Sequence, residues 1–295
     1  MIRITQLHGN GLADHYDCQP FKFPGGEIGI KIPLKDHRKK GEQFIVNAWL
    51  RNSDDIMELF LVFDAIRRQR IRPEMHLVIG YLPYARQDRV CDEGEPLSIS
   101  VMTSLINALD ATSVCLYDPH SNVSLPLINN CREITQADII KSWVCVEGQL
   151  LETPQEWWLV ASDEGARKKI EAIAKEIGAA GVLYACKNRE LSTGKITHTS
   201  LLNAHDVPRL AKLLVIDDIC DGGRTFIELA KVIHEQCIVD QLGLFVTHGI
   251  FSKGFDELNE YYDYIQTTNT YHPNAVNDYR HDGVRDPKFF SHSVF

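Results

Sequence analysis

Two adjacent carboxylates, Asp217 and Asp218, follow an apolar run and precede a tight glycine pair. The apolar run Leu213–Ile216 is typical of a buried strand, and the segment after the glycines has the apolar spacing of a helix. Gly222 and Gly223 allow backbone amides to approach an anion at the helix start, while carboxylates can bind sugar hydroxyls. The segment therefore suits a sugar phosphate, and its structural alternative is a capped strand-to-helix turn.

A second polar segment, Leu82–Arg89, follows the predicted strand Met75–Tyr81. It contains two arginines on either side of a glutamine and an aspartate. Guanidinium groups bind phosphates in a bidentate manner, so the segment is suited to gripping phosphates and purine edges together. The alternative is an ordinary polar loop.

Two single residues follow further predicted strands. His120 comes after Ser113–Tyr117, where it is either a metal ligand, a group that polarises a phosphate, or a hydrogen-bonded core histidine. Asp163 comes after Trp157–Ala161, where it is either a site acid or a helix cap.

The run Cys186–Lys195 carries three cations, Lys187, Arg189 and Lys195, after a predicted strand. Such a run is usually a solvated surface. One that follows a strand and faces an acidic site is instead a candidate for a mobile cationic lid.

These residues must be positioned by alternating strands and helices. Short apolar runs alternate with amphipathic stretches, which is the pattern of βαβ units. Because the strands are apolar throughout, we expect parallel sheets that are covered on both faces. The pattern runs twice, with a break near 138–150, so we expect an α/β fold of two doubly wound parallel-sheet domains, 1–142 and 143–295. The predicted strands are Met75–Tyr81, Ser113–Tyr117, Trp157–Ala161, Gly181–Cys186, Leu213–Ile216 and Leu242–Thr247; the predicted helices are Asp54–Arg68 (capped by Ser53 or Asp54), Ala166–Gly178 (stopped by Gly178) and Arg224–Gln236.

Composition excludes several classes of protein. A chain of 295 residues is long for one core and comfortable for two domains. Its net charge of -9 would repel nucleic acid and anionic membranes, so an anionic ligand must be held by local positive charge. No apolar run approaches the ~20 residues that span a bilayer.

Eight scattered cysteines without a CxxC pair indicate a reduced, cytoplasmic protein without disulfides or structural zinc. The P-loop pattern, HExxH and GxSxG are all missing.

Taken in order, the segments resemble the ribose-phosphate diphosphokinases, also called phosphoribosyl pyrophosphate synthetases, over nearly the whole chain. Any one of the matching segments is weak evidence, but six of them in the same order are strong evidence. They are Phe23–Glu27, like the family's adenine loop; Asp55–Leu59, like its first-domain helix; Pro83–Arg89, like its ATP segment; Asp118–His120, like its magnesium motif; Lys187 with Arg189; and Thr247–Ser252 with Thr267–Thr270.

The resemblance implies two domains of the type I phosphoribosyltransferase fold with an active site between them. It also implies a homo-oligomer built from dimers, often a hexamer, in which a neighbouring subunit supplies the Phe23–Glu27 loop. The implied reaction transfers the pyrophosphoryl group of Mg-ATP to the anomeric hydroxyl of ribose 5-phosphate, giving phosphoribosyl pyrophosphate and AMP. By position in the motifs, the resemblance implies that Lys187, Arg189 and His120 are catalytic and that His120 and Asp163 bind Mg²⁺. It implies that ATP is bound by Phe23, Glu27, Arg86, Gln87 and Asp88. It implies that ribose phosphate is bound by Asp217, Asp218, Asp221, Gly222, Gly223, Arg224 and Thr225.

Three departures from the family pattern bear on the substrate. Gly222 and Arg224 stand where the family has Thr and Gly, which suits a longer anion such as the diphosphate of ADP-ribose. Gly25 replaces the Asp or Asn that contacts adenine. Ser162-Asp163-Glu164 replaces a Pro-Asp motif.

Three functions therefore stay open: a diphosphokinase acting on ribose 5-phosphate, the same chemistry on ADP-ribose or another capped sugar, and a catalytically silent regulatory homologue. A base-transferring phosphoribosyltransferase would share the Asp217–Thr225 loop, but it would not need the arginine-rich segment Pro83–Arg89.

Overall fold

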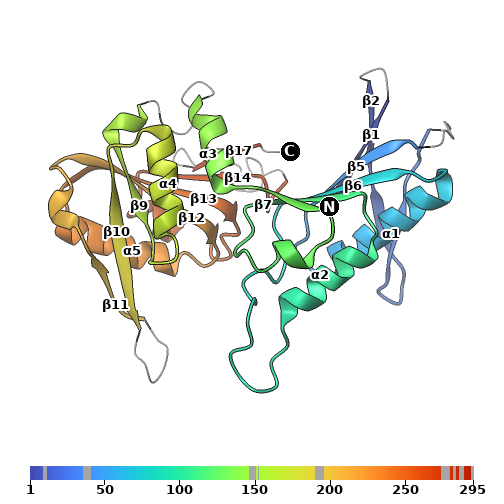
Figure 1. The fold of residues 1–295 in the computed structure, drawn as a ribbon, viewed down its shortest axis with the longest axis horizontal. Coiled ribbons are helices and arrows are strands. Elements are labelled where there is room, and N and C mark those ends of the chain that lie inside the picture. The colour runs from blue at the N-terminus through green and yellow to red at the C-terminus, as the bar shows by residue number, and fades with distance from the viewer. Residues whose placement is uncertain are drawn as a thin grey trace. The chain divides into compact units, whose positions relative to one another are not determined.

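The computed structural model describes residues 1–8, 12–35, 41–145, 151, 153–189, 196–273, 280–281, 284–285 and 289–293. By its contacts the chain divides into two compact units, Met1–Thr135 and a second that begins at Gln136. Each unit has one main sheet with its own helices (Figure 1).

The sheet of the first unit has the strand order β2-β1-β5-β6-β7-β8. The four strands β5 to β8 are parallel, whereas β1 pairs antiparallel with both β2 and β5. A separate hairpin, β3 with β4, forms a two-stranded sheet. The strands are β1 (Ile2–Leu7), β2 (Ala13–Asp17), β3 (Gln19–Lys22), β4 (Ile28–Lys31), β5 (Gln43–Ala48), β6 (Glu74–Ile79), β7 (Ser113–Tyr117) and β8 (Cys131–Ile134).

Helices α1 (Ser53–Gln69) and α2 (Ser98–Ala108) belong to this unit, with a 3₁₀ turn at Leu125–Leu127. The apolar stripe expected for α1 is buried through Leu59, Phe63 and Ile66. Its cap is Asn52, whose side chain accepts a hydrogen bond from the Asp55 N–H, so the prediction of Ser53 or Asp54 was wrong. Asn52, one residue before the observed start at Ser53, has an extended backbone, which is the conformation that an N-cap requires.

The sheet of the second unit has the order β11-β10-β9-β12-β13-β14-β17. All its pairs are parallel except the edge pair β10 and β11. A two-stranded ladder, β15 with β16, lies apart from this sheet. The strands are β9 (Trp157–Ala161), β10 (Gly181–Arg189), β11 (Ile196–Leu201), β12 (Ala211–Cys220), β13 (Val239–Gly249), β14 (Tyr264–Thr268), β15 (Arg280–His281), β16 (Val284–Arg285) and β17 (Phe289–His292).

The helices of this unit lie on both faces of the sheet: α3 and α4 pack together on one side of β9, β12 and β13, and α5 lies on the other (Figure 1). Gly178 ends α4 in a left-handed conformation, as predicted. The predicted α/β class with parallel-sheet domains is confirmed, with antiparallel strands added at the sheet edges. The helices are α3 (Gln136–Cys145), α4 (Arg167–Ile177), α5 (Arg224–Gln236) and α6 (Asp256–Asn259), with 3₁₀ turns at Pro154–Glu156 and Ala204–Asp206.

Candidate active site

The two carboxylates predicted from the sequence lie near the carboxyl end of β12. This strand continues past the end of β9, whose last residue, Ala161, lies opposite Ile216. Asp217 Oδ2 accepts a 2.6 Å hydrogen bond from the Ser162 hydroxyl, and Asp217 Oδ1 accepts one of 2.9 Å from the Asp218 N–H. The Asp217 carboxylate is therefore held in one orientation at the edge where open α/β sheets bind ligands.

Burial changes the acid strength of Asp217. Desolvation raises the pKa of Asp217 to about 7, and the charge of Asp218 adds to the rise. The hydrogen bond from Ser162 acts in the opposite direction. Near neutral pH this carboxyl can both take up and release a proton, which is the property that a general base needs.

A buried glutamine lies behind the Asp217 backbone. Gln136 is 1% exposed, and its Nε2 donates to the Asp217 carbonyl oxygen at 2.6 Å and to Thr247 Oγ1 at 3.0 Å. These bonds join β12 to β13 close to the carboxylates. Gln136 therefore fixes the spacing of the two strands at the site.

The turn after β12 leaves the start of α5 open. Gly223 adopts a left-handed conformation (φ 76°) and forms the N-cap without a side-chain hydrogen bond. The N-cap residue therefore offers no side-chain acceptor to the amides of the first helical turn, and the helix dipole favours an anion there. Arg224 is exposed and Thr225 is half-buried at this end of the helix. The turn has the local form of an anion cradle.

A second loop, which follows β13, packs on this turn. The N–H groups of Ile250 and Phe251 donate to the Cys220 carbonyl oxygen at 2.9 and 3.1 Å. The Ser252 N–H donates to the Asp221 carbonyl oxygen at 3.1 Å, and the Ser252 hydroxyl donates to Asp221 Oδ1 at 2.6 Å. The Asp221 carboxylate is thus oriented by the second loop.

Asp163 lies just beyond the end of β9. Its Oδ1 accepts a hydrogen bond of 3.1 Å from the Ala166 N–H, shortly before α4 begins. The side chain is half-buried and lies one residue from Ser162, which contacts Asp217. The helix-cap contact and a place at the ligand-binding edge are therefore both present.

Strand β10 is longer than the sequence indicated. We expected it to end at Cys186 with a polar loop beyond, but it continues to Arg189 and pairs with β11, where Lys187 lies opposite Thr199. The loop prediction was wrong for Lys187 and Arg189 because an antiparallel partner strand satisfies the backbone of this polar stretch. Figure 1 shows β10 and β11 running on beyond β9 as a two-stranded arm. The side chains of 187–189 and residues 190–195, where the lid was expected, lie outside the described residues.

In the first unit, the loop after β6 carries the segment predicted to bind nucleotide. Leu82 and Ala85 are 2% and 3% exposed and belong to the hydrophobic core. Tyr84, between them, has a positive φ of 63°, and Arg86 is exposed. Two buried apolar side chains therefore anchor the loop and leave its polar residues at the surface.

Gln87 and Asp88 occupy the outer part of the same loop. Gln87 is exposed, and its carbonyl oxygen accepts a hydrogen bond of 3.3 Å from the Ile99 N–H in α2. Asp88 is less exposed and lies 3.9 Å from the Arg89 guanidinium. Because Arg89 is 84% exposed, this ion pair contributes little stability.

His120 lies at the same edge of the first sheet, since β6 and β7 are adjacent and parallel. Asp118 follows β7 with a positive φ of 38°, is 3% exposed, and donates its N–H to the Ile134 carbonyl oxygen at 2.8 Å. This turn brings the chain back to the surface, where His120 is exposed.

The β3–β4 hairpin carries the expected adenine loop. The Phe23 N–H donates to the Glu27 carbonyl oxygen at 2.9 Å, and the Phe23 ring is 51% exposed beside Phe21, with 5.1 Å between ring centroids. A Cβ on Gly25 would lie 2.7 Å from Glu27 Oε2. The Glu27 carboxylate therefore occupies the space where a side chain at position 25 would begin.

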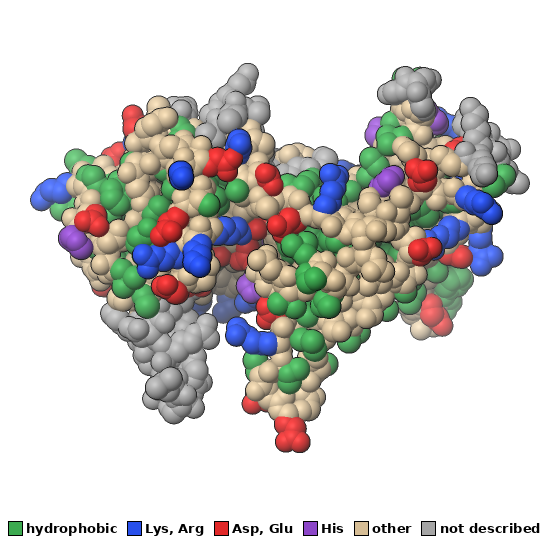
Figure 2. All heavy atoms as spheres, in the orientation of Figure 1, with side chains coloured by type: hydrophobic (Ala, Val, Ile, Leu, Met, Phe, Trp, Pro, Cys, Tyr) green, Lys and Arg blue, Asp and Glu red, His purple; other side chains and the backbone are tan. Residues whose placement is uncertain are grey.

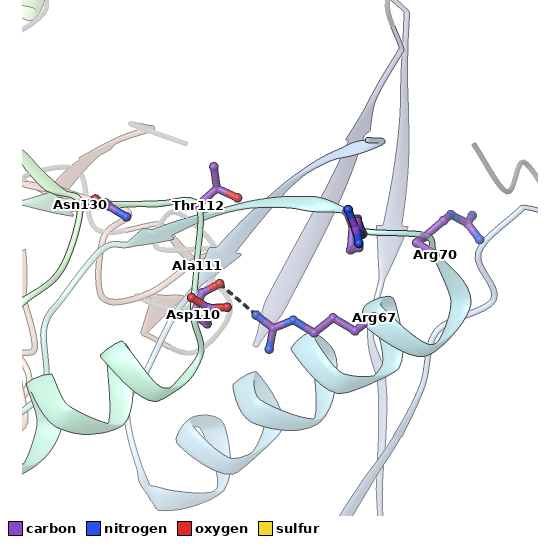
Figure 3. A pocket seen from close by; sticks show the side chains of 8 residues that line it. Arg67, Arg70, Asp110, Ala111, Thr112 and Asn130 are labelled. Carbon is purple, nitrogen blue, oxygen red and sulfur yellow. Dashed lines mark hydrogen bonds between the residues drawn. The ribbon is translucent and has the colours of Figure 1, made fainter. Parts of the chain in front are cut away.

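A basic pocket of about 580 Å³ lies at the opposite edge of the first sheet (Figure 3). Arg67 donates to the Asp110 carbonyl oxygen at 2.9 Å, and Arg70 pairs with Glu42 at 2.9 Å. Arg72 and Thr112 precede β6 and β7 at this edge. The pocket is thus separate from the loops of this unit that follow the strands.

Comparison with known proteins relates both units to one family. Residues 12–109 match the model of the N-terminal domain of ribose phosphate pyrophosphokinase. A ribose-phosphate pyrophosphokinase of Sulfolobus acidocaldarius is 28% identical over 252 residues, covering 84% of this chain and 82% of the relative, and one of Pyrococcus furiosus is 27% identical with 84% of each covered.

The chain is similar to the ribose-phosphate pyrophosphokinases. The fold agrees, since the phosphoribosylpyrophosphate synthetase of Mycobacterium smegmatis superposes with a TM-score of 0.76 at 19% identity, over 95% of this chain and 86% of the other. The family resemblance found in the sequence is therefore confirmed.

Three contacts at the site of this pyrophosphokinase relative were not found by sequence reasoning. They are made by Ser162 to Asp217, by Gln136 to Asp217 and by Ser252 to Asp221. A signal existed for two of them, because Ser162 departs from the family's proline and Ser252 lies in a matching segment to which no role was given.

The residues present fit a magnesium ion carried by a nucleotide. Among the described residues, no group of three or more His, Cys, Asp and Glu side chains is arranged to hold a metal. Mg²⁺ usually keeps several waters and binds one or two carboxylates together with substrate phosphates, so it does not need such a group. The carboxylate of Asp163, fixed by the Ala166 N–H at the ligand-binding edge, is suited to this role.

Proposed function

We propose that the chain transfers the β,γ-pyrophosphoryl group of Mg-ATP to the anomeric hydroxyl of ribose 5-phosphate, forming phosphoribosyl pyrophosphate and AMP. The observation that carries the proposal is the end of β12: two carboxylates, one with a pKa raised to about 7, followed by an uncapped glycine turn. The two carboxylates suit sugar hydroxyls, and the glycine turn suits the sugar's phosphate.

In this reaction the anomeric oxygen forms a bond to the β-phosphorus of ATP. The bond between that phosphorus and the α,β-bridging oxygen breaks, and AMP leaves with the oxygen. Asp217 and Asp218 orient the ribose hydroxyls, and the raised pKa of Asp217 suits it to accept the proton of the attacking hydroxyl. Amides of Gly222 and Gly223 with Thr225 hold the 5-phosphate, beside Asp221 and Arg224.

Charge repulsion between two anionic substrates is the main barrier to their approach. Asp163 and His120 are the residues that would hold Mg²⁺, which would supply positive charge to offset part of the phosphate charge. Lys187 and Arg189 stabilise the charge that develops on the transferring group and on the leaving AMP. A lost stabiliser of this kind typically costs about 10²–10³ in rate.

The nucleotide side of the proposal uses the first unit. Arg86, Gln87 and Asp88 bind ATP from a loop anchored by buried apolar residues, as described above. Phe23 supplies an exposed aromatic ring for stacking on adenine, and Glu27 lies beside it.

We also propose a homo-oligomer built from dimers. Support comes from a stripe of exposed apolar side chains on and beside α2: Leu97 (37% exposed), Val101 (59%) and Leu105 (39%) recur every four residues. Hydrophobic side chains gather in this part of Figure 2. Size-exclusion chromatography with light scattering measures the mass of the assembly, and the mass of a monomer at micromolar concentration contradicts the proposal.

A cytoplasmic location is part of the proposal. The seven cysteines whose side chains are described are free thiols, as in a reducing compartment. No described helix has the length and apolarity needed to cross a bilayer.

On the face drawn in Figure 2, acidic and basic side chains are interspersed, which argues against nucleic acid as a partner.

A second acceptor, ADP-ribose or another capped ribose phosphate, is favoured by one observation. Gly222 has no side chain, and the exposed cation Arg224 follows at the first position of α5. An extra guanidinium beyond a monoester suits the second phosphate of a diphosphate.

The experiment incubates the protein with Mg-ATP and either ribose 5-phosphate or ADP-ribose, and measures AMP release. AMP release with ribose 5-phosphate supports the proposal. AMP release with ADP-ribose but not with ribose 5-phosphate would show that ADP-ribose is the acceptor instead. No release with either sugar contradicts both and favours a catalytically silent homologue. An Asp218→Asn variant should lose AMP release, and Asp240→Asn, an exposed aspartate on β13, serves as the matched control.

A further inference from the structure

The loop after β13 places a lysine against the glycine turn. Phe251 and Phe255 are 5% and 7% exposed and pack edge to face, with ring centroids 6.3 Å apart. Between them the chain turns through positive φ angles at Phe251 (45°) and Gly254 (71°). The segment is thus anchored at both ends and carries Lys253 at its exposed apex.

The stem of Lys253 lies along Gly222. A Cβ on Gly222 would lie 3.7 Å from both Cδ and Cε of Lys253, and 3.9 Å from its Cγ. The lysine methylenes therefore line the space into which a side chain at position 222 would grow. The ammonium is one bond beyond Cε, at the end of this stem.

Position 222 and position 253 thus form a matched pair. A threonine at position 222, the residue of the family pattern, would place its Cβ in van der Waals contact with the lysine stem, 3.7 Å from Cδ and Cε. Glycine gives up the hydroxyl that threonine would offer to a phosphate. Lys253 carries an ammonium at the end of the adjacent stem, and an ammonium is a stronger hydrogen-bond donor to an anion than a neutral hydroxyl.

The charges around the turn support a role with an anion. Among the described residues, neither Lys253 nor Arg224 has a salt-bridge partner. This holds although three aspartates, Asp217, Asp218 and Asp221, lie shortly before Arg224 in the sequence. Asp221 is engaged by the Ser252 hydroxyl at 2.6 Å. Two cations without carboxylate partners at the open start of a helix are available to a phosphate.

We infer that Lys253 binds the 5-phosphate of the acceptor sugar in the space that Gly222 leaves open, and that it determines acceptor affinity. The inference rests on the proposed function for the identity of the acceptor. The group that Lys253 binds is the 5-phosphate, which ribose 5-phosphate and ADP-ribose share. The two sugars are therefore tested separately.

The test compares wild-type protein with Lys253→Met, which keeps most of the stem and removes the charge. Lys175→Met, an exposed lysine of α4 without a salt bridge among the described residues, is the control. Calorimetry measures the Kd of each sugar in the presence of Mg²⁺ and α,β-methylene ATP, which cannot release AMP. Thermal unfolding checks that the variants are folded.

We expect Lys253→Met to raise the Kd of the preferred sugar about tenfold or more, as the loss of one hydrogen bond to a charged group would. The affinity for the nucleotide analogue should stay within about twofold. Equal sugar affinity in wild type and variant overturns the inference, as does an equal loss of sugar and nucleotide affinity.

A second pair of variants tests the match between the two positions. Gly222→Thr should weaken sugar binding because its γ atoms add bulk beside the Lys253 stem, which already lies 3.7 Å from the position of a Cβ. Gly222→Thr with Lys253→Gly should recover part of the affinity. Additive losses in the double variant overturn the matched pair. AMP release by the wild type is measured separately. If the wild type releases AMP but the Kd of the sugar is the same in the wild type and in Lys253→Met, this inference alone is refuted. If the wild type neither binds sugar nor releases AMP, the proposed function is refuted with it.

Discussion

The Ser162 hydroxyl lies 2.6 Å from Oδ2 of Asp217 and joins the ends of two neighbouring parallel strands, β9 and β12. Ser162 is fully buried and directly precedes Asp163. The bond therefore couples the proposed metal carboxylate, through one peptide link, to the proposed sugar carboxylate. A proline at position 162, as in the family pattern, has no hydroxyl to make this bond.

Replacing Ser162 by alanine should shift the pH dependence of turnover. The Ser162 bond lowers the pKa of Asp217, while burial raises it, so its loss should raise the pKa further. If turnover requires ionised Asp217, the acidic limb of the kcat profile moves to higher pH. The same change at Ser104, an exposed serine of α2, should leave the profile in place. An unshifted profile in Ser162→Ala would show that this bond does not tune the reacting group.

Asp217→Asn should stabilise the protein at alkaline pH while abolishing turnover. Burial raises the pKa of Asp217 to about 7, so the folded state keeps a proton that the unfolded chain has already released. The free energy of unfolding contributed by Asp217 therefore falls as the pH rises from about 4 to about 7. Removing the charge should raise the Tm at pH 8, with a gap that narrows toward pH 5. Asp240→Asn is the control, and a lower Tm for Asp217→Asn at pH 8 would contradict the burial argument.

Lys187→Ala should lower turnover by about 10²-fold or more with nucleotide binding kept, because an electrostatic stabiliser of the transferring group is lost. Rapid-mix AMP formation and nucleotide titration measure the two effects. Lys168→Ala, on the exposed face of α4, should be active. Near-normal turnover of Lys187→Ala would refute the role given to the β10 arm.

Arg86→Ala should raise the KM for ATP and leave the fold unchanged, since Leu82 and Ala85, and not the arginine, anchor the loop in the core. We expect a loss of about tenfold or more, as for a hydrogen bond to a charged group. Steady-state kinetics at saturating sugar checks the effect, with Arg209→Ala as the control on an exposed turn. A normal KM for ATP would remove this loop from the nucleotide site.

The parts of the fold with a strong local signal were predictable from the sequence. Strands β7 and β9 and helix α5 have the predicted bounds because apolar runs and amphipathic spacing mark them directly. Strands β1 and β5 were missed because they alternate buried and exposed residues and so lack a continuous apolar run. The end of β10 was misplaced because an antiparallel partner, β11, extends a polar strand that has no apolar run of its own.

The site was predictable only where it lies in one segment. Asp217 to Thr225 are contiguous, so their chemistry could be inferred from spacing. The contacts of Ser162 with Asp217 and of Lys253 with Gly222 join residues 55 and 31 positions apart. Only the parallel order of β9, β12 and β13 brings such residues together.

The transfer of an intact pyrophosphoryl group is tested most directly by phosphorus NMR of the reaction with Mg-ATP and the acceptor sugar. The account predicts equal amounts of AMP and of a sugar that carries a diphosphate on its anomeric carbon. Formation of ADP with a sugar that carries a single new phosphate would contradict it.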